Sequence, residues 1–371
     1  MLFLLIPFIL YLSILLFFSI SNIIFKSLSL TNNADFGISV IVAIRNGENS
    51  LNNLIFNLSS QDYRGPIEFI LVDDESTDQT KKIILDIAKK DSRFRYVSSI
   101  DGDQNLTLKK KALDIGIQKS KYDYLLFTDV DCSMHCSWVS TMANYFYLGF
   151  EYLVGYSLTQ KSNIYNFVSS FQEMDLFILM VMCRGSSYFT RPWACSGQNQ
   201  GFSKTLYNKV GGFKSIRKFI GDDTAFLQLC RNKSANITFV DQHSACILSR
   251  QETNIFSFLF QRARWAFDAN QIWRINARFY SILIITFLAY LIIPLFIFSS
   301  IFSLNLIIYL IASKLLLEWM LVYIGSIRYS KKIYWIDFVI WELFHIPYII
   351  LVGIMSFFGR QIKWKNRNIS I

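Results

Sequence analysis

Charged residues are missing from long stretches of this chain. None occurs before Lys26, and from Phe279 to Ile327 only Lys314 and Glu318 are charged. About 20 mostly apolar residues are enough to cross a bilayer. Because 53% of the 371 residues are hydrophobic, the composition excludes an ordinary soluble domain and predicts membrane-spanning segments.

We therefore predict an N-terminal transmembrane anchor over 1–25 and a C-terminal membrane region over 279–371. An anchor is favoured over a cleaved signal peptide, because no basic segment precedes the apolar run and the run is long for a signal sequence. The range 279–327 has room for two spans, in which Lys314 and Glu318 are expected to pair at a spacing of four. A further run, 335–358, is long enough to span but polar and broken, so its crossing stays open.

Closely spaced cysteine ligands are also missing. The six cysteines form no tight framework, which favours reduced thiols, and the Cys132-x3-Cys136 pair has no partner pair at zinc spacing. The basic residues behind the net charge of +10 cluster at 328–332 and 360–367, beside apolar runs. Such clusters mark the cytoplasmic side of a membrane and favour anionic lipid over nucleic acid.

Between the two apolar zones, from 36 to 273, branched apolar runs alternate with amphipathic stretches. This alternation predicts an α/β domain with an open parallel sheet, whose ligands bind beyond the carboxyl ends of the strands. The expected strands are 38–44, 67–72, 94–98 and 124–128, and the expected helices are 48–60, 78–90 and 109–120.

Acidic residues follow two of these expected strands. Asp73 and Asp74 come after the second, where carboxylates can accept hydrogen bonds from a nucleobase or a ribose. Asp129 and Asp131 come after the fourth, and two carboxylates so close together suit a hard cation that also binds phosphate. An isolated D-x-D would more simply be a solvated loop, but the strand before it and the companion motifs favour a site.

Two later motifs complete the series. The acids of Gly221-Asp222-Asp223 are followed by Gln261-Arg262-Ala263-Arg264-Trp265. In a helix Gln261, Arg264 and Trp265 share one face, where they offer a hydrogen bond, a cation and a stacking surface. The alternative for Arg264 and Trp265 is an interfacial anchor before a span.

Taken together, these motifs resemble those of the inverting family 2 glycosyltransferases with the Q-x-x-R-W motif. The resemblance covers about 36–265 and includes Val40-Ile41-Val42-Ala43-Ile44-Arg45-Asn46-Gly47-Glu48 and Val72-Asp73-Asp74-Glu75-Ser76-Thr77-Asp78. It implies a GT-A fold, a Rossmann-like mixed sheet, here with transmembrane helices on both sides. The chain departs from the family pattern at Ala43, Gly47 and Glu75, where proline, glutamate and glycine are common.

The resemblance also implies roles for single residues. Asp223 would be the general base that takes the proton from the acceptor, with Asp222 as the alternative, and Arg264 would serve catalysis at the diphosphate. Gln261 and Trp265 would face the acceptor or product. The donor, a nucleotide-sugar, would be bound by Asp73, Asp74, Asp129, Asp131 and Lys110, with Mg²⁺ or Mn²⁺ on Asp129 and Asp131. Lys109 matches the lysine position equally, and a solvated helix start is the alternative for both lysines.

The predicted protein is a membrane glycosyltransferase with a cytoplasmic catalytic domain over 36–273, in a bacterial inner membrane. It transfers a hexose from a UDP-linked donor to an acceptor at the membrane surface, for which a lipid is favoured over a glycan. A processive polysaccharide synthase shares these motifs and is the alternative enzyme. A non-catalytic membrane scaffold is the alternative from another class. The sequence leaves the sugar, the acceptor and the oligomeric state open.

Overall fold

The structure is a computed structural model that describes residues 2–31, 33–160, 166–189, 191–299 and 303–358. These residues form two compact units. The first, here called the sheet unit, comprises the described residues of 27–160 and 191–250. The second, the helical unit, comprises those of 1–26, 161–190 and 251–358. Each unit is described separately below.

The sheet unit contains a seven-stranded mixed sheet in the order β3-β2-β1-β4-β8-β6-β9. Neighbouring strands are parallel except that β8 runs antiparallel to both β4 and β6. The strands are β1 (Ile38–Ile44), β2 (Ile67–Asp73), β3 (Phe94–Ser98), β4 (Tyr124–Phe127), β6 (Tyr152–Gly155), β8 (Gln200–Ser203) and β9 (Ile237–Val240). Two predicted strands, 38–44 and 94–98, coincide with β1 and β3.

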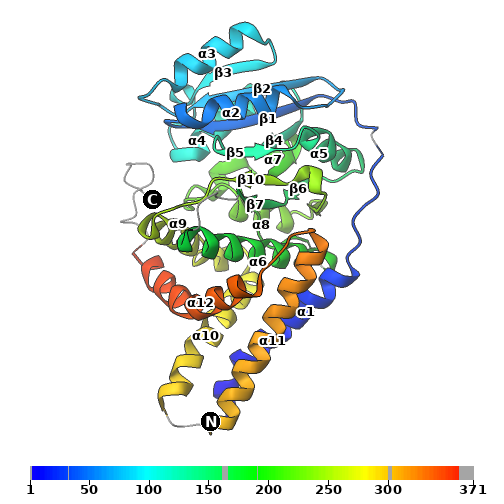
Figure 1. Ribbon diagram of the computed structural model, residues 1–371. Coiled ribbons are helices and arrows are strands. Elements are labelled where there is room, and N and C mark those ends of the chain that lie inside the picture. Colours follow the sequence, from blue (N-terminus) through cyan, green and yellow to red (C-terminus); the bar gives the residue numbers. More distant parts are fainter. Residues whose placement is uncertain (1, 32, 161–165, 190, 300–302, 359–371) are drawn as a thin grey trace. The chain divides into compact units, whose positions relative to one another are not determined.

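Helices cover both faces of this sheet, as its apolar strands require. Val40 and Val42 of β1 share a buried core with Leu51 and Leu54 of α2. The α4 helix packs on the opposite face, where a Cβ on Gly116 would lie 2.6 Å from Ile41 Cγ2. The helices are α2 (Glu48–Ser59), α3 (Thr80–Lys90), α4 (Leu108–Lys119), α5 (Trp138–Tyr147), α7 (Lys204–Lys209) and α8 (Thr224–Asn232) (Figure 1).

A smaller three-stranded sheet lies in the same unit. It has the order β5-β10-β7, formed by β5 (Cys132–Met134), β10 (Ile247–Ser249) and β7 (Ser157–Thr159). Because β5 begins directly after Asp131, the Asp129–Asp131 turn links the end of β4 in the large sheet to the first strand of the small one. The turn is therefore held at both ends.

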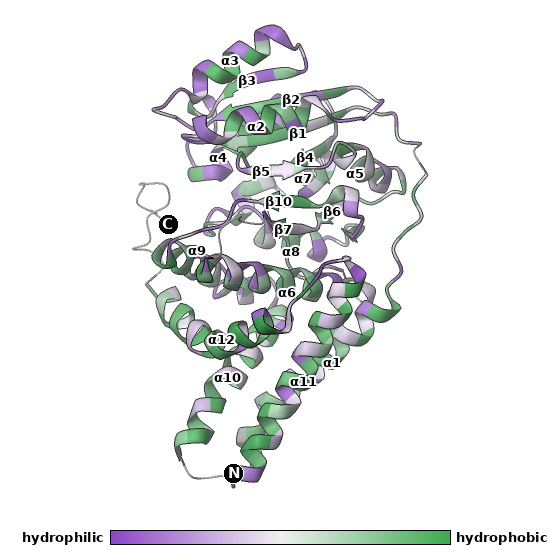
Figure 2. Cartoon of the chain, viewed as in Figure 1, coloured by the Kyte–Doolittle hydropathy of each residue, from purple (hydrophilic) through white to green (hydrophobic). Residues whose placement is uncertain are grey.

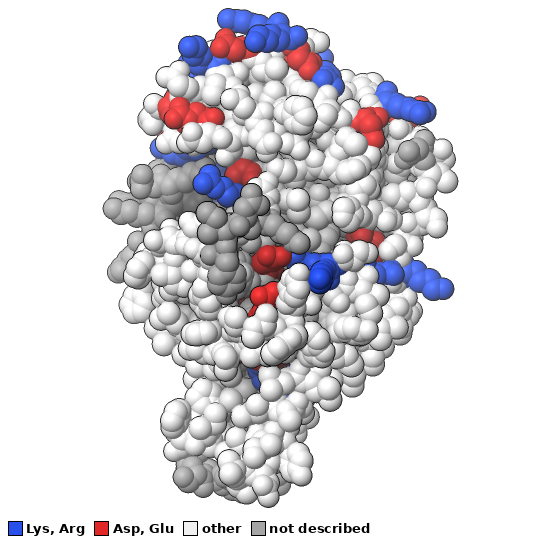
Figure 3. Space-filling model, in the orientation of Figure 1, with Lys and Arg blue, Asp and Glu red and all other residues white. Residues whose placement is uncertain are grey.

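The helical unit contains four helices that are long and apolar enough to cross a membrane. These are α1 (Ile6–Ile24), α10 (Ala277–Ser299), α11 (Leu304–Arg328) and α12 (Trp335–Ser356). The same unit also contains α6 (Phe167–Phe189) and α9 (Ile255–Ala269). Figure 2 shows the predominance of apolar residues along α10, α11 and α12, and Figure 3 shows a mostly uncharged surface over α10 and α11. The long run 335–358 is thus one helix, although Pro347 lies inside it.

The predicted catalytic domain, 36–273, differs from this division because α6 and α9 belong to the helical unit. Arg184 of α6 shows why. Its buried guanidinium donates to the Asn22 carbonyl at 3.0 Å and to the Phe25 carbonyl at 2.8 Å. These carbonyls lie at the C-terminus of α1, where a cation is favoured by the helix dipole. This contact joins α6 to α1, within the helical unit.

The two charges of the predicted spans are paired, which confirms that part of the sequence analysis. Lys314 Nζ lies 2.6 Å from Glu318 Oε2, and it also lies 2.5 Å from Glu342 Oε2 of α12. Tyr290 of α10 and Tyr11 of α1 both donate hydrogen bonds to Glu318 Oε1. Glu342, one of the residues that make the run 335–358 polar, therefore has a cationic partner on α11, and the network connects four helices.

Candidate active site

A lysine and three carboxylates of the sheet unit lie together beyond the end of β4. Lys109 Nζ lies 2.7 Å from Asp129 Oδ1 and 3.7 Å from Asp222 Oδ1. Their side chains are 17%, 28% and 8% exposed, so Asp129 is the most accessible of the three. Asp223 follows Asp222 directly at the start of α8. These residues come from three separate segments of the chain, and the fold brings them to one place.

Electrostatics keeps the lysine of this cluster charged. Burial alone would lower the pKa of Lys109, but the negative charges of Asp129 and Asp222 outweigh burial and raise it above its ordinary value. The ammonium group is therefore permanently cationic near neutral pH. A fixed cation beside acidic residues is suited to balance the charge of a bound diphosphate.

Asp223 is held by the backbone as the N-cap of α8. Its Oδ1 accepts a hydrogen bond from the Thr224 amide at 2.5 Å, and its Oδ2 accepts one from the Gly197 amide at 3.0 Å. Burial, followed by the charge of Asp222, raises the pKa of Asp223 to about 6. In contrast, Asp222 Oδ2 is buried without a hydrogen-bond partner in the part of the chain that the structure describes. Asp223 is thus both well oriented and a stronger base than an ordinary aspartate.

We expect this pKa to appear in the pH dependence of the reaction. A general base works only when deprotonated, so kcat/KM should fall as the pH drops through about 6 and be constant above it on this limb. In Asp222→Asn the limb should move to lower pH, because the neighbouring negative charge that raises the pKa is gone. The test is to measure kcat/KM against pH for the unchanged protein and for Asp222→Asn, with the exposed Asp86→Asn as control. If the acidic limb of Asp222→Asn is not shifted, the assignment of this pKa to Asp223 is contradicted.

Gly197 is a site residue that the sequence analysis did not single out. A Cβ there would lie 3.2 Å from both Asp222 Oδ2 and Lys109 Nζ and 3.5 Å from Asp223 Oδ2. Its amide also binds Asp223, so the glycine lets the backbone approach the acids closely. Gly197 and Asp223 are 26 positions apart, so this contact could not be predicted from the sequence motifs.

Asp73 and Asp74 have protein partners at the end of β2. Asp73 Oδ1 accepts from the Ser76 amide at 3.0 Å and its Oδ2 from the Tyr96 hydroxyl at 3.4 Å. Asp74 Oδ1 accepts from the Ser99 hydroxyl at 3.0 Å. Both side chains are buried, so these hydrogen bonds set the shape of the loop. Their predicted contact with the nucleoside stays a prediction.

The departure at Glu75 has a structural consequence, because this residue has a φ of +54°. A left-handed backbone costs a non-glycine residue about 1–2 kcal/mol of stability, which glycine avoids. Glycine also makes the unfolded chain more flexible, and this offsets part of the gain. We expect Glu75→Gly to stabilise the protein by up to about 1 kcal/mol, read as a higher thermal midpoint in detergent. Glu75→Ala is the matched control and should give no gain; equal midpoints for the two variants would contradict the strain.

Of the two candidate lysines, Lys110 has its ammonium buried against backbone carbonyls, and its predicted contact with the donor stays a prediction. Its side chain is 1% exposed, and its ammonium donates to the carbonyls of Ile216, at 3.2 Å, and Phe219. Successive residues at a helix start point in different directions, and Lys109 is the one that the structure shows against Asp129. Lys110 instead fixes the segment that leads to Asp222.

Gln261, Arg264 and Trp265 lie on α9, which belongs to the helical unit. Asn254 is the N-cap of this helix, and its side chain accepts from the Phe256 amide at 2.8 Å. Gln261 is half-buried, and Trp265 is 39% exposed. The helical spacing assumed for the motif is therefore present, while its roles stay predictions.

Comparison with protein families decides the classification. A model described as glycosyl transferase family 2 matches residues 39–217, and one described as glycosyl transferase family group 2 matches residues 134–356, more than half of the chain. The chain is a family 2 glycosyltransferase. The matches cover both the acidic cluster and α9.

The fold of this glycosyltransferase agrees with a solved relative. A mannosyltransferase from Pyrobaculum calidifontis, in complex with GDP-mannose and Mn²⁺, aligns over 95% of each chain with a TM-score of 0.61 and 15% identity. At this identity the likeness shows the fold alone. It confirms the predicted GT-A class, with its mixed sheet.

Two curated relatives match over shorter segments of this glycosyltransferase. An uncharacterised glycosyltransferase of Haemophilus influenzae is 36% identical over 94 residues, 25% of this chain and 36% of that protein. A GalNAc(5)-diNAcBac-PP-undecaprenol β-1,3-glucosyltransferase of Campylobacter jejuni is 27% identical over 124 residues, 33% of this chain and 39% of that protein. The matches span well under half of either relative.

Proposed function

We propose that this glycosyltransferase transfers a hexose, with inversion, from a UDP-sugar to a lipid acceptor at the membrane surface. The observation that carries the proposal is the cluster of Lys109, Asp129, Asp222 and Asp223 in a chain of this family. An inverting transfer needs a base opposite the leaving group. It also needs positive charge at the diphosphate. The cluster contains both within one unit.

In this proposal the catalytic roles divide between two neighbouring acids. Asp223 takes the proton of the acceptor hydroxyl as its oxygen attacks the anomeric carbon, since its pKa of about 6 leaves it ionised at neutral pH. Asp222 stays close to Lys109 and maintains the negative charge that raises the basicity of its neighbour. Asp73 and Asp74 bind the uridine portion of the donor.

Asp129 and Asp131 would hold the divalent metal, Mg²⁺ or Mn²⁺. The donor set fits, because hard cations prefer carboxylate oxygens and usually keep substrate phosphates among their ligands. No three His, Cys, Asp or Glu side chains are grouped as a metal site within the described residues, so phosphate oxygens of the donor would complete the coordination. When bound, the metal neutralises charge on the leaving diphosphate. Lys109 would assist as a second, fixed cation.

A lipid acceptor is supported by two findings. The helical unit contains four apolar helices of membrane-spanning length, and the Campylobacter jejuni relative is named for transfer to an undecaprenol-linked glycan. Basic residues at 328–332 follow α11 and favour a cytoplasmic face, here of a bacterial inner membrane. A processive polysaccharide synthase is the alternative enzyme, and the length of the product distinguishes it.

The direct test is to incubate membranes containing the protein with a panel of labelled nucleotide-sugars and to extract the lipids. We expect label from one UDP-sugar in the lipid fraction, with a single sugar added per acceptor. An Asp223→Asn protein expressed to the same level serves as control. Label in a water-soluble polymer would support the synthase instead, and no transfer from any donor would support a scaffold.

Arg264 and Trp265 should separate the two halves of the reaction. Arg264→Ala is expected to lower both donor hydrolysis and lipid transfer, because both release the same diphosphate, by about 10²-fold. Trp265→Ala should mainly lower lipid transfer, because water needs no stacking surface. Donor hydrolysis, lipid transfer and membrane-bound protein are measured together. Equal losses in all three would identify both residues as interfacial anchors.

A further inference from the structure

One face of α9 carries a buried arginine between two aromatic rings. Phe258, Arg262 and Trp265 lie four and three residues apart and so share one side of the helix. The guanidinium carbon of Arg262 is 5.1 Å from the centroid of the Phe258 ring and 4.1 Å from that of Trp265. A planar guanidinium at such distances stacks on the ring faces. Arg262 has no role in the reaction proposed above.

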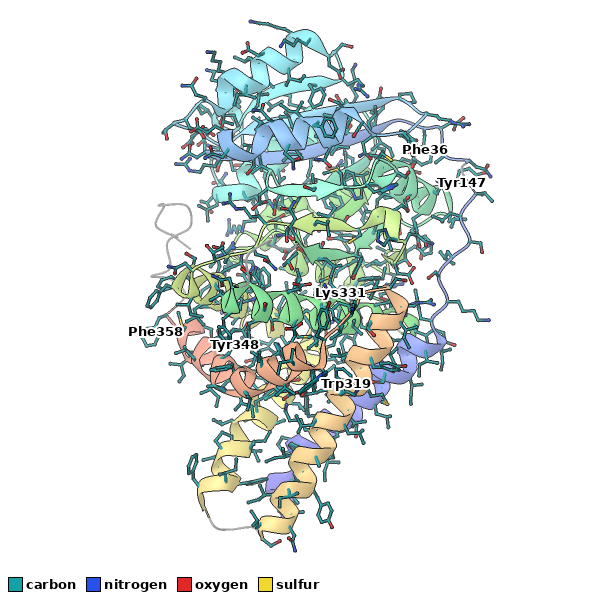
Figure 4. All side chains as sticks on the ribbon, viewed as in Figure 1. Phe36, Tyr147, Trp319, Lys331, Tyr348 and Phe358 are labelled. Carbon is teal, nitrogen blue, oxygen red and sulfur yellow. The ribbon has the colours of Figure 1, made fainter. Side chains whose placement is uncertain are left out.

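The charge of this arginine is balanced from α6. Asp175 Oδ2 lies 2.9 Å from Arg262 Nη2, with side chains that are 8% and 3% exposed. Burial raises the pKa of Asp175, and the charge of Arg262 opposes this shift. Tyr348, labelled on α12 in Figure 4, lies edge-on to Phe171 of α6 at 5.1 Å and stacks on Phe258 at 5.5 Å. Three helices therefore enclose the ion pair.

The stability that the Arg262–Asp175 ion pair contributes does not explain why these two charges are buried. Nε, Nη1 and Nη2 of Arg262 all lack a well-aimed hydrogen-bond acceptor among the residues the structure describes, although the ion-pair distance is short. Moving two charges out of water costs about as much as their attraction returns, and apolar side chains of similar volume often stabilise a protein equally. What apolar side chains would not supply is a flat cation against the indole of Trp265.

The exposure of the two stacked groups differs strongly. Trp265 is 39% exposed, whereas Arg262 is 3% exposed. The guanidinium thus lies on the inner side of the indole and leaves the outer side accessible. The stacked guanidinium restricts the indole of Trp265 to one orientation. An exposed tryptophan on a helix without such a contact would adopt several rotamers.

We propose that Arg262 and Asp175 are positioning residues, which hold the indole of Trp265 in the orientation that binds the acceptor. The inference rests on the proposed function, in which Trp265 lies on the acceptor side. Asp175 orients the guanidinium, and the guanidinium orients the ring. Both side chains of the pair are buried, so in this proposal their effect on the reaction passes through Trp265.

A double-mutant cycle tests this chain of contacts. Arg262→Lys keeps the charge and the ion pair but loses the planar stacking group. It should raise the KM for the lipid acceptor by about five- to tenfold and leave donor hydrolysis unchanged. In a Trp265→Ala background the same change should have no further effect. Arg274→Lys is the matched control, since Arg274 stacks on the exposed Trp273 at 5.5 Å; it should leave the acceptor KM unchanged.

A second variant covers the case in which Arg262→Lys folds poorly. Asp175→Leu combined with Arg262→Met removes both charges together, so that no unpaired charge stays buried. It should raise the acceptor KM similarly, again only when Trp265 is present. Additive effects of the pair and Trp265, or an unchanged KM in this variant, would overturn the inference while leaving the proposed function intact. If Trp265→Ala alone leaves the KM unchanged, the acceptor-side role fails and the inference falls with it.

Discussion

Asp223→Asn should lower the turnover of glycosyl transfer by about 10²-fold or more. The asparagine keeps the size of the side chain, and its carbonyl oxygen can still cap α8 through the Thr224 amide. Its NH2 group cannot accept the hydrogen bond from the Gly197 amide, so we expect a loss of stability of about 1 kcal/mol. It cannot take the proton from the acceptor hydroxyl. Donor affinity should therefore stay near normal while kcat falls. Steady-state kinetics with the labelled UDP-sugar, together with donor binding measured separately, checks both parts.

Asp222→Asn is the matched control for this experiment, because it changes the adjacent acid in the same way. It should cost less, as Asp222 acts through charge and through its contact with Lys109 at 3.7 Å. If Asp222→Asn is inactive and Asp223→Asn nearly normal, the base is Asp222. Its partnerless Oδ2 would then be the atom that accepts the proton.

The first half of the sheet unit could be predicted from sequence because its signals are local. The ranges of β1 and β3 are as expected, and the expected helix 48–60 is α2, Glu48–Ser59. Branched apolar runs bounded by polar turns specify buried parallel strands, and an aspartate at the end of such a run marks the ligand-binding edge. Asp129 was therefore visible without a structure, whereas Asp222 and Asp223, which follow no strand, were found through the resemblance to the family motifs.

Residues whose role depends on long-range contacts were less predictable. Lys109 and Lys110 are adjacent and chemically identical, and the positions of the Ile216 and Phe219 carbonyls decide which of the two ammonium groups is buried against the backbone. Arg262 looked like a spacer in the Q-x-x-R-W motif because its partner, Asp175, is 87 positions earlier (262 − 175). The inclusion of α6 and α9 in the helical unit depends on similar contacts, such as that of Arg184 with α1.

Removal of divalent cations should abolish transfer completely. The chain offers Asp129 and Asp131 for a metal, and no larger group of metal-binding side chains occurs within the described ranges. Binding of the donor diphosphate should therefore depend on the metal, and binding of the metal should depend on the diphosphate. Dialysis against a chelator, followed by Mg²⁺ or Mn²⁺, should first remove and then restore activity. Full activity in chelator would sink the metal assignment.

The contact between Lys109 and Asp129 makes the metal prediction sharper. At 2.7 Å the ammonium occupies one oxygen of the carboxylate that the metal needs, so cation and lysine compete for it. Lys109→Met should then lower the half-saturating Mn²⁺ concentration several-fold, roughly the effect of removing one nearby charge. The same change should reduce kcat, because a fixed cation is lost from the diphosphate. Asp131→Asn should shift the Mn²⁺ requirement upward instead. If the half-saturating Mn²⁺ concentration falls in one variant and rises in the other, at matched protein levels, the metal is shared between Asp129 and the donor. If the ion pair is only structural, Lys109→Met should leave the Mn²⁺ requirement unchanged.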